Sequence, residues 1–222
     1  MINTQYRIIL LRHAESIKNV KKIHGGQGEE LTEKGIKQCH AFSDILRNHI
    51  DLSKLRIFAS TSFHTRATAS IICEDLNISL EKPIDFKPLY LGVADGLSEK
   101  ELEDKDPIAS NLFIKWRKKE IDIKELKVKD MEHYMTFWNR GLNIIENLPH
   151  DSNVVLVCSN SLMILLSHIM LNNHPETSNK YRHIDIKNCE SLTFFTSDLK
   201  NFTVDKSLSN VEEYGLLPKL VV

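Results

Sequence analysis

A short hydrophobic run early in the sequence ends in residues whose types suit chemistry on a phosphate group. The four residues Arg12-His13-Ala14-Glu15 follow Ile8–Leu11, a branched apolar run typical of a buried strand. Open α/β sheets bind ligands in the crevice beyond the carboxyl ends of their strands. A guanidinium in that crevice can bind a phosphate through two hydrogen bonds, and a neutral imidazole can attack phosphorus. Taken alone, the segment fits equally well a strand that merely ends in polar residues.

A second predicted strand also leads into a polar turn. Leu55–Ala59 is apolar enough to be buried, and we expect a helix from about residue 65 to residue 76 after it. Arg66 falls at that strand-to-helix junction, where a guanidinium and the backbone N–H groups of a helix start together attract an anion. For His64 we weigh a place in the pocket against one at the surface or the core edge, and favour the second.

The most apolar predicted strand lies in the second half of the sequence. Val154–Cys158 is followed by Ser159-Asn160-Ser161 and then by a strongly apolar helix, expected at Ser161–Leu171. The polar turn again lies between the end of a buried strand and the start of a helix. Asn160 therefore joins Arg12 and Arg66 as a candidate for the same crevice.

The elements that must position these residues alternate between strand and helix. This alternation predicts a three-layer α/β/α fold with a mostly parallel sheet, in a single domain spanning residues 1–222. Tyr6–Leu11 is the first strand, and Thr32 is expected to cap the helix after a glycine-rich loop at Ile23–Glu30. Thr193–Phe195 and Phe202–Val204 predict a hairpin near the end of the sequence.

A helical, charged stretch interrupts this alternation. We interpret Leu97–Asp130 as an insertion that lies over the site within the same domain. Its basic cluster, Lys115–Lys119, is either a solvated helix face or part of a lid that attracts anionic substrates. The following segment, Tyr134–Leu148, repeats apolar residues at three- and four-residue spacing and is expected to pack on the core as a helix.

Composition and charge exclude several classes of protein. The 222 residues are 41% hydrophobic and 27% charged, which is ordinary for a globular protein, and the net charge of −1 argues against nucleic-acid binding. Four dispersed cysteines and the lack of a secretory signal favour a reducing, cytoplasmic setting. No His or Cys pair has metal-ligand spacing, and no run is long enough to span a membrane. No metal or cofactor is expected, and the sequence leaves the oligomeric state open.

The ordered motifs resemble those of the histidine phosphatase superfamily, which includes the phosphoglycerate mutases. They are R-H-x-E-x-x-x-N, from Arg12 to Asn19, and L-T-x-x-G-x-x-Q at Leu31–Gln38. The resemblance implies a phosphoglycerate mutase-like fold and a small phosphorylated substrate. It also implies a phosphohistidine intermediate at His13, two phosphate-binding arginines, Arg12 and Arg66, and a place for Asn19 near the pocket. Because the nucleophile must be neutral, we expect the second ring nitrogen of His13 to donate to a nearby carbonyl.

Two positions depart from the family pattern. The strand that matches Val154–Cys158 usually ends in a second histidine, and Asn160 stands there. The carboxylate that many members use as proton donor falls near Pro88, so Asp95 is our candidate for that role, against its reading as a turn former. Glu15 is either an orienting carboxylate or a helix-start residue. Whether Asn160 is natural or introduced stays open.

These features leave three functions to be compared. The leading hypothesis is a phosphohydrolase acting on a small phosphomonoester through His13, with activity impaired by Asn160. The first alternative is a catalytically weak or inactive protein that binds a phosphorylated ligand. The second is a mutase-type phosphotransferase, which usually carries a fuller set of acid and histidine residues. A scaffold that engages an acidic partner through Lys115–Lys119 is a further, more remote reading.

Overall fold

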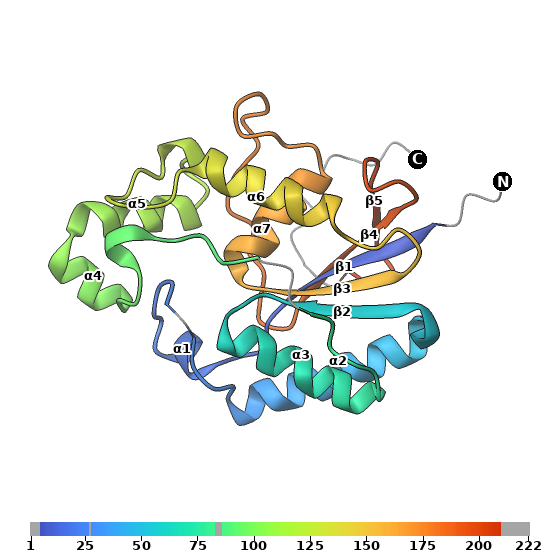
Figure 1. Ribbon diagram of the computed structural model, residues 1–222. Coiled ribbons are helices and arrows are strands. Elements are labelled where there is room, and N and C mark those ends of the chain that lie inside the picture. Colours follow the sequence, from blue (N-terminus) through green and yellow to red (C-terminus); the bar gives the residue numbers. More distant parts are fainter. Residues whose placement is uncertain (1–4, 27, 83–85, 210–222) are drawn as a thin grey trace.

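A mixed five-stranded sheet forms the middle of the molecule in the computed structural model, which describes residues 5–26, 28–82 and 86–209 (Figure 1). Its strand order is β2-β3-β1-β4-β5, in which β1, β2 and β3 are parallel and β4 and β5 are antiparallel to their neighbours. The strands are β1 (Tyr6–Arg12), β2 (Leu55–Ala59), β3 (Asn153–Cys158), β4 (Ser191–Thr196) and β5 (Thr203–Asp205). The mostly parallel sheet and the C-terminal hairpin confirm the predicted α/β fold.

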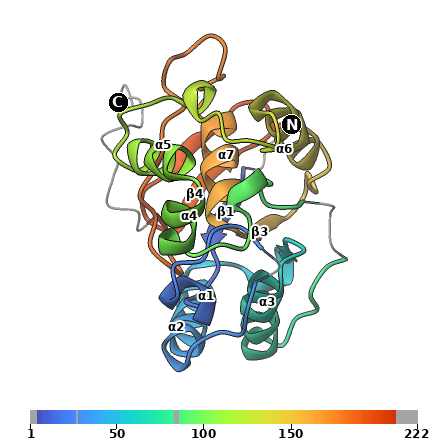
Figure 2. The same ribbon diagram turned by 90° about the vertical axis from the view of Figure 1, so that its left-hand side faces the viewer.

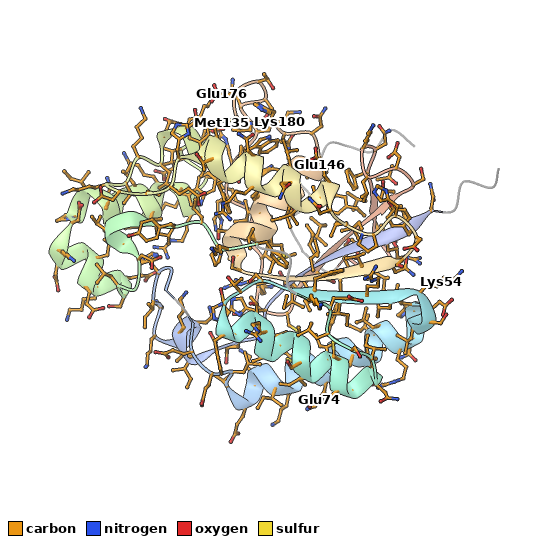
Figure 3. All side chains as sticks on the ribbon, viewed as in Figure 1. Lys54, Glu74, Met135, Glu146, Glu176 and Lys180 are labelled. Carbon is orange, nitrogen blue, oxygen red and sulfur yellow. The ribbon has the colours of Figure 1, made fainter. Side chains whose placement is uncertain are left out.

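Helices cover both faces of this sheet. In Figure 1, α2 and α3 lie on one face and α6 and α7 on the other. Charged side chains such as Lys54, Glu74 and Glu146 point away from the sheet into solvent (Figure 3). The helices of four or more residues are α1 (Ile17–Val20), α2 (Glu33–His49), α3 (Phe63–Leu76), α4 (Glu99–Lys105), α5 (Pro107–Arg117), α6 (Tyr134–Glu146) and α7 (Asn160–Met170).

Strand β1 contributes to two hydrophobic cores because successive side chains on a strand point to opposite faces. Ile8 and Leu10 belong to the core beneath α6 and α7, whereas Ile9 and Leu11 belong to the core beneath α2 and α3. All four are at most 1% exposed. Burial on both faces explains why the run lacks the alternating polarity of a half-exposed strand.

The register of the parallel strands brings their carboxyl ends together. Arg12 at the end of β1 pairs with Cys158 at the end of β3, and the backbone N–H of His13 donates to the Cys158 carbonyl at 3.0 Å. The N–H of Ser60, just after β2, donates to the Val157 carbonyl at 3.0 Å. The turns after β1, β2 and β3 therefore meet at one edge of the sheet.

Two helix starts differ in how well the sequence predicted them. Thr32 caps α2 as expected, because its hydroxyl accepts the N–H of Gly35 at 3.0 Å. Helix α3 begins at Phe63, two residues before the expected start, and Thr65 lies inside it. This earlier start changes which side chains the first turn of α3 presents to the strand ends.

The charged stretch between residues 97 and 130 forms α4, α5 and a 3₁₀ turn at Ile123–Glu125. Ser98 and Asp106 cap the two helices through hydrogen bonds to backbone N–H groups. Helices α4 and α5 pack on each other (Figure 2). Ser98, just before α4, forms an isolated antiparallel β-bridge with Ile23 in the loop after α1. No helix among the described residues is both long and apolar enough to cross a bilayer.

Candidate active site

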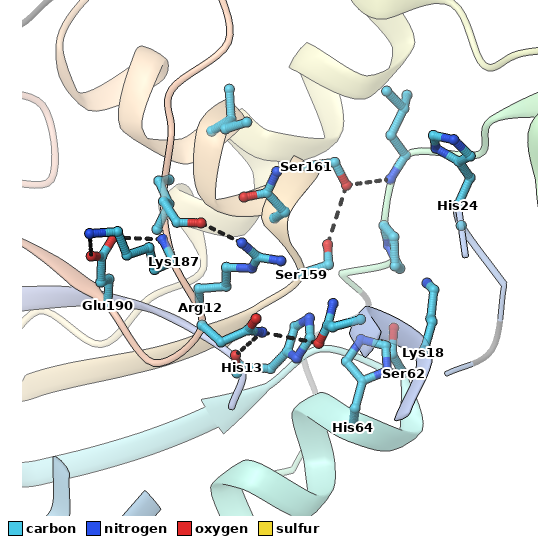
Figure 4. Close-up of a pocket in the computed structure, with 18 of the residues that line it drawn as sticks. Arg12, His13, Lys18, His24, Ser62, His64, Ser159, Ser161, Lys187 and Glu190 are labelled. Atoms are coloured by element: carbon cyan, nitrogen blue, oxygen red, sulfur yellow. Dashed lines mark hydrogen bonds and ion pairs between the residues drawn. The ribbon is translucent and has the colours of Figure 1, made fainter. Parts of the chain in front are cut away.

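A cavity of about 1060 Å³ lies where the three strand ends meet (Figure 4). Arg12 and His13 line it from the end of β1, His64 from the first turn of α3 after β2, and Asn160 from the start of α7 after β3. The structure thus brings together the polar turns that sequence reasoning placed in one crevice. Lining residues also come from α5, α6 and the segment before β4, which lie far away in the sequence.

The imidazole of His13 is oriented by a backbone carbonyl. The side chain is 4% exposed, and Nδ1 lies 2.8 Å from the carbonyl oxygen of Ala14. Since a carbonyl can only accept, Nδ1 carries the proton and Nε2 keeps its lone pair, as expected for a nucleophile. Burial, aided by the neighbouring His64 and Arg12, holds the pKa of His13 well below its usual value. His13 is therefore neutral at pH 7.

Arg12 is the charged group nearest to His13 in sequence, and a distant backbone segment holds it. Its Nη1 donates to the carbonyl of Ile186, and its buried Nε has no hydrogen-bond partner among the described residues. Burial lowers the pKa of Arg12 to about 10, so the guanidinium remains charged at neutral pH. Its unpaired Nε–H leaves it able to donate to an anion.

Residues 181–190, which we call the strap, cross this edge of the sheet before β4. The N–H of Arg12 donates to the Glu190 carbonyl at 2.9 Å. The amide of Asn188 donates to the His13 carbonyl at 3.0 Å and to Asn19 Oδ1 at 3.1 Å. Asn19 lines the cavity, as the resemblance implied. Its amide oxygen also accepts the backbone N–H of Ser16 at 3.0 Å. The sequence provided no motif for the strap, although its backbone fixes the Arg12-His13 pair.

The second cation expected after β2 is not where the motif placed it. Arg66 is exposed and does not line the cavity, whereas His64 is 2% exposed and does. The ring centroid of His64 lies 3.9 Å from that of His13, at an interplanar angle of 52°. Because α3 starts at Phe63, His64 occupies its first turn beside the strand end. Burial, with Lys18 and Arg12 nearby, lowers the pKa of His64 to about 4.

Lys18 lines the cavity, although the sequence analysis did not single it out. Asp95, the expected proton donor, is not among the lining residues. Lys18 lines the cavity from α1, and burial lowers its pKa against the opposing attraction of Asp95. Asp95 does not line the cavity: its Oδ1 would lie 1.9 Å from a Cβ atom at Gly25, a glycine that does. The Asp95 carboxylate thus packs behind the loop and acts on the site through its charge.

Asn160 and Pro88, the two positions at which we expect departures from the family pattern, both line the cavity. The Asn160 Oδ1 atom, at the start of α7, is buried and has no partner among the described side chains and backbone groups. Ser161 Oγ accepts the N–H of Leu89 at 3.2 Å and lies 3.3 Å from Ser159 Oγ. The Asn160 amide is therefore available to a ligand, whereas Ser161 holds the segment that follows Pro88.

Every carboxylate that lines the cavity has a basic side chain within 4.0 Å. The hydrogen bond from Lys34 lowers the pKa of Glu15, and that from Arg117 lowers the pKa of Glu99 although burial opposes it, so these two carboxylates are poor proton donors. The four pairs are Glu15–Lys34, Glu99–Arg117, Asp185–Lys119 and Glu190–Lys187. Within the described ranges, no group of three or more His, Cys, Asp or Glu side chains gathers as a candidate metal site.

Comparisons with known proteins concern the family and the fold of this chain. The sequence profile of the histidine phosphatase superfamily (branch 1) matches residues 8–206. The fold resembles that of a mycobacterial glucosyl-3-phosphoglycerate phosphatase solved with VO3, at a TM-score of 0.71 and 20% identity, covering 90% of this chain and 97% of that one. No curated protein sequence matches this chain significantly.

Two further solved structures are similar. A phosphoglycerate mutase from Bacillus anthracis gives a TM-score of 0.71 at 19% identity, covering 91% of this chain and 92% of that one. An Escherichia coli protein proposed to be an alpha-ribazole-5′-P phosphatase gives 0.71 at 18% identity, covering 92% and 96%. At these identities the likeness concerns the fold.

Proposed function

The chain belongs to branch 1 of the histidine phosphatase superfamily, and on that basis we propose that it hydrolyses a small phosphomonoester through a phosphohistidine at His13. The observation that carries this proposal is the orientation of His13. The Ala14 carbonyl accepts its Nδ1 proton, which leaves a neutral, nucleophilic Nε2 beside the Arg12 guanidinium.

Binding of the phosphate rests on Arg12, Asn160 and Lys18. Arg12 has an unpaired N–H. Asn160 stands at the start of α7, where helix N–H groups attract anions, and we assign its Nδ2 group, rather than the acceptor Oδ1, as a neutral donor to the phosphate. Lys18 adds a second positive charge from α1. Arg66 is left out of this set because its side chain is exposed outside the cavity. We assign Asn19 a positioning role, because its amide oxygen accepts a hydrogen bond from Asn188 and so holds the strap against α1.

The reaction proceeds in two displacements. In the first, His13 Nε2 forms a bond to phosphorus as the bond from phosphorus to the alcohol oxygen breaks, and that oxygen takes a proton from water. Asp95, the carboxylate expected for this proton transfer, is not among the cavity-lining residues. In the second, the hydroxide left by that proton transfer attacks phosphorus, the nitrogen–phosphorus bond breaks with its electron pair returning to Nε2, and hydrogen phosphate leaves. Positioning and charge compensation supply most of the catalysis of such transfers.

Asn160 makes this a slow enzyme in our proposal. A protonated histidine would add positive charge to the phosphoryl transition state, whereas the amide offers only a neutral hydrogen bond. Loss of one such donor costs about 10²- to 10³-fold in rate. We therefore propose that replacing Asn160 by histidine raises turnover by about that factor.

The experiment compares the unmodified chain with Asn160→His and His13→Ala. Each is incubated with a generic aryl phosphate, and acid-labile phosphate on the protein is measured together with the release of alcohol. We expect slow turnover from the unmodified chain, faster turnover from Asn160→His and no label in His13→Ala. Undiminished turnover in His13→Ala would show that the nucleophile is wrongly assigned.

The alternative is a phosphate-ligand-binding protein with negligible turnover. The pairing of all four described cavity carboxylates with basic groups favours it, because none of these carboxylates is left without a basic partner to serve as proton donor to the leaving group. In this case phosphate or vanadate binds with an affinity that depends on Arg12. Neither the unmodified chain nor Asn160→His then releases alcohol.

A further inference from the structure

The cavity is apolar on the side formed by α5, α6 and the beginning of the strap. Two pairs of rings are in contact on this side, each at an interplanar angle of 30°. The ring centroids of His24 and Phe113 are 4.9 Å apart, and those of Trp116 and Tyr181 are 6.2 Å apart. We call this side the apolar end. The apolar residues that line it are Phe113, Trp116, Ile123, Leu126, Phe137 and Tyr181.

Charged groups next to the apolar end are engaged with one another. Arg117 forms an ion pair with Glu99, which also lies 3.8 Å from Lys22. Lys119 pairs with Asp185 at 3.3 Å. Burial lowers the pKa of His24, so that its ring is neutral at pH 7. Two members of the Lys115–Lys119 cluster, Arg117 and Lys119, thus have carboxylates as partners.

The part of the cavity lined by the end of β1 and by α1 has the reverse character. Arg12 and Lys18 are cationic there, and the nucleophile His13 lies beside them. A phosphomonoester has a doubly charged phosphate at one end and an alcohol group at the other. The two ends of the cavity match those two parts in charge and polarity.

We propose that the substrate is the phosphate ester of an apolar, aromatic or aliphatic alcohol without a second anionic group. The inference rests on the proposed function and names the substrate class of the same site. It places the phosphate at Arg12 and His13 and the apolar group between Phe113 and Trp116. It also separates this chain from a mutase acting on phosphoglycerate, because the carboxylate of that substrate would meet no unpaired cation among the residues of the apolar end.

Binding of three phosphonates tests the proposal without turnover. They share a three-carbon reach and differ in the group carried at the far end: 3-phenylpropylphosphonate, propylphosphonate and 3-phosphonopropionate. Burying a phenyl ring against apolar side chains should tighten binding by about 10- to 100-fold over propylphosphonate. The carboxylate compound should bind no more tightly than propylphosphonate. Affinities are measured by titration calorimetry at pH 7.

Variants on α5 locate the effect. Phe113→Ala should weaken binding of the phenyl compound far more than binding of propylphosphonate and so remove most of the preference, and the milder Phe113→Leu should remove part of it. Ile108→Ala is the matched control, because Ile108 lies on the same helix, is 77% exposed and does not line the cavity. Propylphosphonate binding reports whether each variant is folded, and Phe113→Leu serves if Phe113→Ala is not.

Each remaining outcome overturns one proposal or both. Equal affinity for the phenyl and propyl compounds, or tighter binding of the carboxylate compound, overturns the substrate class while the phosphate pocket stands. A phenyl preference that survives in both Phe113 variants also overturns it. Failure of all three phosphonates to bind the unmodified chain overturns the phosphate pocket and the proposed function with it.

Discussion

His168 on α7 should make the fold sensitive to mild acid. Its Nε2 lies 2.8 Å from the Arg182 carbonyl, which can only accept, so Nε2 carries a proton. Its Nδ1 lies 3.2 Å from the Asn173 side-chain nitrogen, a donor, so Nδ1 must be bare. A second proton, on Nδ1, would point at the Asn173 N–H donor, and water cannot relieve this clash because His168 is only 1% exposed. Burial lowers the pKa of His168 to about 4, from 6.5 in the unfolded chain.

The sign and size of the effect follow from linkage. Because the folded pKa is the lower one, the unfolded state binds the proton first as pH falls below about 6.5, and stability declines until the folded pKa is reached. Each pH unit in that window costs about 1.4 kcal/mol. Between pH 7 and pH 5, His168 should therefore lower the free energy of unfolding by about 2 kcal/mol.

The assay compares urea unfolding at pH 7 and pH 5 for the unmodified chain, His168→Gln and His150→Gln. Glutamine can still donate to the Arg182 carbonyl but does not titrate, so His168→Gln should lose about 2 kcal/mol less on acidification. His150 is exposed, and the same substitution there should follow the unmodified chain. Equal acid losses in all three proteins would refute the reasoning and indicate that Asn173 turns its amide oxygen toward a protonated ring.

Three further perturbations test local features. Gly28 has φ +92°, and a Cβ there would lie 2.0 Å from His64 Nδ1. Gly28→Ala should therefore displace the His64 ring and weaken phosphate binding, measured by calorimetry. The control is Gly96→Ala, at φ +82° with nothing within 4 Å of its Cβ, which should leave the phosphate affinity unchanged. Thr32→Ala removes the cap of α2 and should cost about 1 kcal/mol in urea unfolding, whereas Thr32→Ser should keep it; equal losses would contradict the capping role. Leu10→Ala leaves a cavity in a fully buried site and should cost about 2–5 kcal/mol; a loss below about 1 kcal/mol would show that the core collapses around it.

The meeting of Arg12, His13 and Asn160 was predictable because it depends on strand type alone. Long apolar runs that lack alternation are buried on both faces, and buried strands separated by helices are parallel. Parallel strands have their carboxyl ends at the same edge of a sheet. Any polar residues that directly follow such runs must therefore lie near one another, whatever the lengths of the connections.

The placement of Arg66 failed because the turn before α3 contains several hydroxyl residues that are equally plausible helix caps. Ser62 precedes the helix, yet its side chain makes no capping hydrogen bond. Thr65, which resembles a cap, lies inside the first turn, where its hydroxyl oxygen is 2.8 and 2.7 Å from the carbonyl oxygens of Ser60 and Ser62 and donates its one proton to this pair. Because α3 begins two residues earlier than expected, His64 lines the cavity in place of Arg66.

The strap escaped prediction for a different reason. Its contacts with the site use backbone groups, such as the Ile186 carbonyl on Arg12 and the Glu190 carbonyl on the Arg12 N–H. Every residue type carries a backbone carbonyl, so no motif marks these contacts. Its one informative side chain, the Asn188 amide, lies 175 residues from the His13 carbonyl that it contacts. Sequence patterns within a short window do not report pairings over such a span.

The central place of β1 in the sheet delays folding during synthesis. Ile8 pairs with Val154 on one side and with Phe194 on the other, so both partners of this strand are made long after it. At about 5–20 residues per second, the wait for β3 lasts on the order of 10 to 30 seconds. Throughout it, the run Ile8–Leu11 has no strand to pair with and is a target for chaperones and for aggregation. The strand that carries the nucleophile is thus also the segment of the nascent chain that most needs protection.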